Sequence, residues 1–146
     1  MAAGTWTLYN NARKKLVNGT VDLDTTAIRM KFYKGTAAAS VSLSTMSLIS
    51  QIGTTNATTN MSVYPLVSKS VVAIAASATH KFTAANIVAT ASGGAATVQY
   101  AVIYSSTGAG EGHVICWCKL STAAFAVTST NTITVTTPAN GFFVIY

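Results

Sequence analysis

The chain has 146 residues, of which 50% are hydrophobic and only 8% are charged, whereas about a quarter of an ordinary soluble domain is charged. Nine Lys and Arg face three Asp and Glu, so the net charge of +6 reflects a shortage of acids more than a wealth of bases. That balance weakens the inference of nucleic-acid binding that a basic chain otherwise invites. The length predicts a single domain over residues 1–146, large enough to bury a core of its own.

No segment of the sequence is expected to enter a membrane. The longest apolar run, residues 71–76, falls far short of the roughly 18–20 residues that a membrane helix requires. Residues 1–9 lack the basic and then apolar order of a secretion signal. We therefore expect a protein that is made and assembled in a cytoplasm.

Residues 5–18 form the one good helix candidate. The hydroxyl of Thr5 or Thr7 could accept a hydrogen bond from a free backbone N–H at the helix start. Apolar positions recur at four-residue spacing, at Leu8, Ala12 and Leu16. Gly19 supplies the stop, because glycine readily takes the left-handed conformation. Trp6, just ahead of the apolar stripe, is expected to hold the helix against a sheet.

A turn at residues 21–25 precedes an amphipathic strand at residues 27–33. Asp22 and Asp24 in the turn can bond their own backbone, which is the local role that short acids favour. A catalytic pair is not indicated, because a general acid and a general base need opposed environments. Along the strand, Ile28, Met30 and Phe32 share one face, and Arg29, Lys31 and Tyr33 share the other.

Most of the basic residues lie near the N-terminus and could form one surface beside Tyr33. Six of the nine fall in the first 34 positions, namely Arg13, Lys14, Lys15, Arg29, Lys31 and Lys34. Such a surface could bind a nucleic-acid backbone, but no recognition motif accompanies it, so a solvated face or an acidic protein partner is favoured. The candidate docking residues are Trp6, Arg13, Lys14, Lys15, Arg29, Lys31 and Tyr33.

Residues 35–60 are the least determined part of the chain. Charge is absent from residue 36 to residue 67, and the hydrophobic periodicity is weak. A long loop in a compact domain usually carries function or becomes ordered against a partner. We expect an arm or inter-subunit loop here. The alternative is an extra hairpin with short strands at residues 41–43 and 48–52.

The remaining sequence predicts a series of short strands separated by turn residues, the pattern of an antiparallel sandwich or barrel. The predicted strands are residues 61–66, 68–76, 80–84, 86–90, 97–104, 113–120, 131–136 and 141–146. Residues 68–76 are too apolar on both faces to be exposed. The turn before residue 97 is expected at Ser92, Gly93 and Gly94.

Alternation assigns the faces of the two longest predicted strands. In the first, Val98, Tyr100, Val102 and Tyr104 share one face, and Gln99, Ala101 and Ile103 share the other. In the second, Val114, Cys116, Cys118 and Leu120 lie opposite Ile115, Trp117 and Lys119.

The last two strands are expected to pair as a hairpin. Its turn is residues 138–141, with the Asn-Gly pair that favours hairpins, and it sets Ile133 and Val135 against Phe143 and Ile145. Residues 142–146 contain no charge and no proline. Such a strand left at an edge promotes aggregation, so we expect it to lie centrally in a sheet or to be covered by another chain.

The sequence offers few groups for catalysis or for binding a metal or cofactor, and none is assigned. Cys116 and Cys118, two apart in a strand, are at the outer limit for a disulfide, and we expect buried reduced thiols. His80 and His113 are the only further metal ligands of the imidazole type, and each is interpreted as a residue without a catalytic role. The protein is therefore not expected to be an enzyme.

Together these patterns predict a mainly all-β fold, an antiparallel β-sandwich of jelly-roll-like form with one short N-terminal helix. The sequence also resembles a family of small virion proteins of tailed bacteriophages. The segments that carry the resemblance are Trp6-Thr7-Leu8-Tyr9-Asn10, Leu16-Val17-Asn18-Gly19, Val21-Asp22-Leu23-Asp24-Thr25, residues 28–33, Phe82-Thr83-Ala84-Ala85-Asn86-Ile87-Val88, Gly93-Gly94 and Tyr100-Ala101-Val102-Ile103-Tyr104.

The resemblance implies a structural protein of the virion, a capsid decoration (cement) protein that trimerises on the head and binds the major capsid protein. It implies a location on the capsid surface, and no catalytic residue is carried over from it. Two alternatives stay open: a tail, head–tail junction or fibre component, and a carbohydrate-binding sandwich module in which Trp117, Tyr33 or Tyr104 would stack on sugar.

Overall fold

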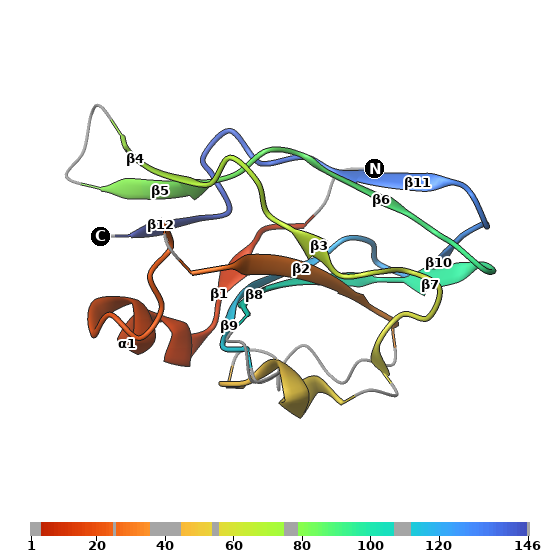
Figure 1. The fold of residues 1–146 in the computed structure, drawn as a ribbon, viewed down its shortest axis with the longest axis horizontal. Helices are drawn as coiled ribbons and strands as arrows, with labels where there is room; N and C mark the ends of the chain where they lie inside the picture. The colour runs from red at the N-terminus through yellow and green to blue at the C-terminus, as the bar shows by residue number, and fades with distance from the viewer. Residues whose placement is uncertain are drawn as a thin grey trace.

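The structure is a computed structural model that describes residues 4–24, 26–35, 45–53, 56–74, 79–106 and 112–145. Its strands form two layers, drawn one above the other in Figure 1, with the helix α1 beside the lower layer. The elements are β1 (Thr7–Leu8), α1 (Asn10–Val17), β2 (Ile28–Tyr33), the 3₁₀-helix η1 (Ile49–Ile52), β3 (Tyr64–Pro65), β4 (Ser70–Ala73), β5 (His80–Thr83), β6 (Ile87–Thr90), β7 (Ala96–Val98), β8 (Tyr100–Ser105), β9 (Val114–Lys119), β10 (Phe125–Val127), β11 (Thr132–Val135) and β12 (Phe143–Ile145).

The lower layer is a five-stranded sheet with the order β1-β9-β8-β2-β3, in which every pair is antiparallel. The pair β7 and β10 lies at one end of this layer (Figure 1). The upper layer contains a three-stranded sheet, β12-β5-β4, and the pair β6 and β11. The prediction of a mainly antiparallel β fold with one helix is confirmed, and the jelly-roll arrangement stays a prediction.

The main hydrophobic core lies between the two layers. It is built from alternating inward residues such as Ile28, Met30 and Phe32 of β2, as the alternation of that strand predicts. Aromatic rings join the layers: Trp6 meets Phe142 edge to face, with ring centroids 4.9 Å apart. Since such pairs stabilise beyond the area they bury, they fix how the last segment of the chain closes the sandwich.

A second, smaller core covers the outer face of the lower sheet. Tyr9, Tyr33 and Val102 are buried there beneath η1, whose Ile52 is only 2% exposed. The segment 45–53 is held in place by backbone bonds, among them the bridge between Leu48 and His113. The lower sheet is therefore covered on both faces, and β8, at its centre, is buried along its whole length.

The prediction for residues 35–60 is revised where the structure describes them. Residues 45–53 fold back on the chain's own sheet, and the predicted strand at residues 48–52 is the 3₁₀-helix η1. Neither an arm nor a sandwich hairpin is seen in that part. The predicted strand at residues 41–43 lies outside the described residues.

The helix is shorter than predicted at its start. It begins at Asn10, because Thr7 and Leu8 pair with Trp117 and Cys116 as the edge strand β1. The N-cap is Tyr9 with no side-chain cap bond, so the predicted threonine cap is wrong. The predicted end is confirmed at Asn18 and Gly19, and Gly19 has a φ of 72°.

Two departures from strict alternation correct the predicted faces. The backbone leaves strand geometry at Gln99, between β7 and β8, so Val98 lies in the main core with Ala101 and Ile103 instead of sharing a face with Tyr100. A bulge in β9 then places Val114 in the small core, while Cys116 stays in the main one. In a β-strand, one extra residue moves all following side chains to the opposite face.

The last two strands do not pair with each other. β11 pairs with β6 and β12 pairs with β5, so the predicted hairpin between residues 131–136 and 141–146 is wrong. The turn itself is confirmed: the N–H of Gly141 donates to the carbonyl of Pro138 over 2.8 Å, and Gly141 has a φ of 74°. The turn carries the chain from one end of the upper layer to the other (Figure 1).

One prediction about burial is wrong, and one branch of another is excluded. β4 was predicted to be covered, yet its residues are half-buried or exposed, with Val72 41% exposed. β12 was predicted to be central, yet it lies at the edge of its three-stranded sheet, opposite β4. The alternative prediction, that another chain covers residues 142–146, stays open.

Candidate docking surface

The described residues assemble no cluster that could hold a metal ion. Nowhere in that part of the chain do three His, Cys, Asp or Glu gather closely enough to hold a metal ion. The predicted burial of Cys116 and Cys118 is confirmed, and both are free thiols. Burial raises the pKa of Cys118 to about 11 and that of Cys116 well above its ordinary value. Neutral, inaccessible thiols are poor nucleophiles, and the molecule's surfaces are therefore its candidate functional features.

Helix α1 presents two of the predicted docking residues to solvent and turns the third inward. Arg13 and Lys14 are exposed. The Nζ of Lys15 donates to the hydroxyl of Ser47 over 2.8 Å and meets Nδ1 of His113. Burial lowers the pKa of the Lys15 amine. Lys15 therefore links helix α1 to the segment 45–53 and to the residue just before β9. That residue is His113. We expected it to be a loop residue without a role, but it takes part in this contact.

Strand β2 places its predicted docking residues differently. Arg29 is exposed, whereas Lys31 is half-buried with its Nζ 5.6 Å from the centroid of the Tyr33 ring, a distance at which a cation is attracted to an aromatic face. Tyr33 is 1% exposed and Trp6 is 8% exposed. Those two side chains belong to the cores, so their proposed docking role is corrected.

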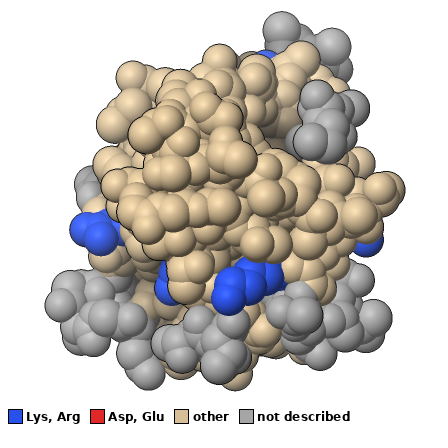
Figure 2. Space-filling view, turned by 90° about the vertical axis from the view of Figure 1, so that its right-hand side faces the viewer, with Lys and Arg blue, Asp and Glu red and all other residues tan. Residues whose placement is uncertain are grey.

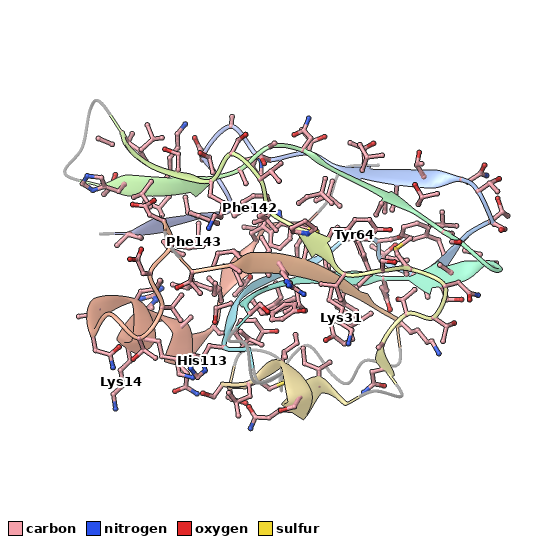
Figure 3. The ribbon with its side chains drawn as sticks, in the orientation of Figure 1. Lys14, Lys31, Tyr64, His113, Phe142 and Phe143 are labelled. Carbon is pink, nitrogen blue, oxygen red and sulfur yellow. The ribbon has the colours of Figure 1, made fainter. Side chains whose placement is uncertain are left out.

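The basic residues do not form the single surface that the sequence suggested. In Figure 3, Lys14 lies on the helix at one end of the molecule and Lys31 lies under the middle of the sheet, with His113 between them. These two lysines therefore lie on different parts of the molecule (Figure 3). A track for a nucleic-acid backbone needs several aligned cations, and two of the six, Lys15 and Lys31, are half-buried in contacts within the chain.

The end of the molecule that carries the turns of β6, β7, β10 and β11 shows few charges and no visible acid (Figure 2). Figure 2 views this end directly: basic atoms lie at its edges and in the lower middle of the view, the centre and most of the upper part show none, and no acidic atom is visible. Val88 of β6 has an apolar side chain that is 57% exposed. Covering a surface with few charges costs little desolvation, and this end is therefore a candidate docking surface.

A groove of about 1530 Å³ runs along one side of the sandwich. Its walls come from the N-terminal segment around β1, from β10 and β11, and from residues 136–144. Arg13 is the one charged residue among the described residues that line it. The floor includes Trp6, whose Nε1 is buried without a hydrogen-bond partner in the described part of the chain.

The strands around this groove are edge strands. In the described residues β1 pairs only with β9, β10 only with β7, β11 only with β6 and β12 only with β5. An unpaired strand edge presents a row of free N–H and C=O groups that another strand can bind. The groove therefore combines a low charge with backbone groups that suit an extended chain.

Sequence reasoning missed the groove because it depends on which strands pair. The one available signal was the run of uncharged residues 142–146, which indicated an edge that needs covering. The pairing of β11 and β12 with different partners could not be read from that run. Among the described residues, no helix has both the length and the apolar character to span a bilayer. Comparison with protein families, curated proteins and solved structures found no match.

Proposed function

We propose that the protein is a non-enzymatic structural protein of a bacteriophage virion, a capsid decoration protein that binds the major capsid protein and copies of itself. The observation that carries the proposal is the scarcity of charge, with 8% charged residues in the chain and Arg13 as the one charged residue among the described residues that line the groove. The resemblance of the sequence to small virion proteins supports the same class. On this proposal the protein is located on the capsid surface, after assembly in the host cytoplasm.

The physical basis of binding would be burial of uncharged surface at the junctions of the shell. Burial of apolar surface contributes about 25 cal/mol per Å², while association costs roughly 4–15 kcal/mol in lost freedom of motion. A single contact of modest area is therefore weak. Repetition over a symmetric shell raises the effective concentration at each further contact, and many modest contacts then hold firmly. The exposed Arg13, Lys14 and Arg29 would steer the approach to an acidic capsid surface.

The alternative of a tail, head–tail junction or fibre component rests on the same surface and differs only in location. The carbohydrate-binding alternative has less support. Tyr33 is 1% exposed and Tyr104 is 9% exposed, and Trp117 is half-buried with its Nε1 shielded. A sugar-binding site needs an accessible aromatic face, and these three residues do not provide one.

Two experiments test the proposal. The first is electron microscopy of the parent particle. The second is co-sedimentation of the purified protein with shells of the major capsid protein. We expect saturable binding that changes less than about threefold between 50 and 500 mM salt, because buried uncharged contacts are little screened. Binding that falls steeply over this range, or binding to glycans and not to shells, would overturn it. A charge reversal of Arg13 and Lys14 should slow association and leave the final occupancy almost unchanged.

A further inference from the structure

The segment 45–53 covers an aromatic patch on the outer face of the lower sheet. The patch consists of Tyr9, Tyr33, Tyr100 and Trp117, which belong to the small core or pack against it. Tyr9 is 0% exposed and Tyr33 is 1% exposed. The rings of Tyr100 and Trp117 lie with their centroids 6.2 Å apart. Opening of the cover would therefore bring aromatic surface into contact with water.

Two backbone hydrogen bonds join the cover to the start of β9. The N–H of Ile49 donates to the carbonyl of Gly112 over 2.8 Å. The N–H of Val114 donates in the other direction, to the carbonyl of Ser47 over 3.2 Å. A segment that is tied by few such bonds opens locally more easily than the centre of a sheet. Side-chain contacts at the same place therefore influence how often the cover opens.

The side chain of Lys15 closes this contact from helix α1. Its Nζ donates to the hydroxyl of Ser47 over 2.8 Å and meets Nδ1 of His113 (Figure 3). A lysine amine that is only partly buried keeps its proton below pH 7, and an ammonium group can donate hydrogen bonds but cannot accept them. Nδ1 of His113 can therefore accept from Lys15 only while it carries no proton. The closed cover selects the neutral imidazole.

A second proton on His113 would remove this bond and place two cations in contact. A free imidazole takes up that proton near pH 6.5. In the open form the imidazole is separated from Lys15, so the open form binds the proton more readily than the closed form does. The closed form is therefore favoured above about pH 6.5 and becomes less favoured as the pH falls.

The other titratable groups that the described residues place around His113 do not change this sign. The segment 45–53 contains no titratable residue. Helix α1 contributes only cations, which are Arg13, Lys14 and Lys15. Tyr104 of β8 stays neutral at acidic pH, because burial raises its pKa. Glu111, two positions before His113, lies outside the described residues, and a variant at that position is part of the test.

We propose that Lys15 and His113 form a pH-sensitive latch, in which protonation of His113 below about pH 6.5 loosens the segment 45–53 and uncovers the aromatic patch. At neutral pH the patch is held closed. At acidic pH it becomes available for contact with apolar surface. The latch is a property of a single chain and requires neither a shell nor a second copy, so it is independent of the proposed function.

Hydrogen exchange at single amides, followed by NMR, measures the opening of the cover. The N–H groups of Ile49 and Val114 have their acceptors across the contact. Their protection factors, corrected for the intrinsic exchange rate at each pH, should fall by up to about 30-fold from pH 7.5 to pH 5.0. One excluded proton with an ordinary histidine pKa gives this ratio. The N–H of Phe142, which donates to the carbonyl of Phe82 in the upper layer, should keep its protection within about twofold.

The two histidines of the chain provide a matched pair of variants. His113→Gln keeps an acceptor for Lys15 and takes up no proton, so the protection of Ile49 should be the same at both pH values. His80→Gln, at the exposed start of β5, should keep the wild-type pH dependence. Lys15→Met keeps the apolar stem and removes the cation. It should lower the protection at pH 7.5 and leave a pH dependence of less than about threefold.

Wild-type protection that changes by less than about threefold between the two pH values would overturn the inference, and so would a pH dependence that survives in His113→Gln. If Glu111→Gln abolishes the dependence and His113→Gln does not, the titrating group is the carboxylate and the inference is wrong. Circular dichroism shows whether each variant is folded. Should His113→Gln unfold, the imidazole resonances of His113 in the wild type replace it. They must shift over the same pH range in which Ile49 loses protection, and a shift over a different range overturns the latch.

Discussion

Replacement of Phe142 by alanine should remove a large part of the stability of the fold. Phe142 is 1% exposed and lies between the layers, with its ring centroid 4.9 Å from that of Trp6 and 6.3 Å from that of Phe82 (Figure 3). Truncation of a buried phenylalanine costs about 3–5 kcal/mol through lost transfer energy and the cavity left behind. The value should lie in the upper part of that range, because two aromatic contacts are lost as well.

Urea denaturation followed by tryptophan fluorescence measures this loss, at one fixed protein concentration because association shifts the apparent stability. At about 2–4 °C per kcal/mol for a domain of this size, the melting temperature should fall by roughly 10 °C. Phe142→Leu, which keeps most of the volume, should cost less than about 1.5 kcal/mol. Val88→Ala, at a side chain that is 57% exposed, should cost less than about 0.5 kcal/mol. A loss below about 1 kcal/mol for Phe142→Ala would mean that the last segment does not close the sandwich.

Three further predictions concern the cysteines, a glycine and pH. Cys116 and Cys118 should react with a thiol reagent only as fast as the protein unfolds. Rapid labelling of the native protein would contradict their burial. Gly112→Ala should destabilise the protein by about 1–3 kcal/mol in urea denaturation, because the new Cβ would lie 2.2 Å from the carbonyl oxygen of Ser105. Gly19→Ala, where nothing lies within 4 Å, should cost about 1 kcal/mol from its positive φ alone. Burial raises the pKa of the Cys118 thiol from 9.0 to about 11 and also raises that of Tyr9. The unfolded chain therefore loses these protons first, so these groups leave stability unchanged between about pH 8 and pH 9 and lower it as pH rises toward about 11. A melting temperature unchanged between pH 8 and pH 11 would refute this assignment.

The residues of β2 show what local pattern can determine. Its alternation of Ile28, Met30 and Phe32 with polar residues predicted both the strand and its inward face, and the structure confirms them. The face of Tyr33 was predicted to be outward, which is correct, but its burial under η1 was not foreseen. Alternation assigns a side chain to one face of a sheet, while only the path of the rest of the chain decides whether that face is covered.

The candidate docking surface divides in the same way. Its low charge follows from the sequence, because only three acids and nine bases are available for the surface of a chain of 146 residues. The groove and its unpaired edges follow from pairing, and pairing joins residues far apart in the chain, as β12 joins β5. A bulge at Ile115 and the break at Gln99 each shift the register by one residue, and a single shift exchanges the two faces.

The sequence by itself determined the fold class, the helix end at Gly19, the turn at Gly141 and the scarcity of charge, since each depends on the conformational freedom or polarity of neighbouring residues. Tertiary structure alone decided that Trp6 belongs to the core and that, among the described residues, β4 and β12 form the two edges of their sheet. The physical reason is that many short uncharged segments of this chain could each pair with several others, and local sequence does not distinguish these pairings. Its outcome depends on how all of them fill one core together.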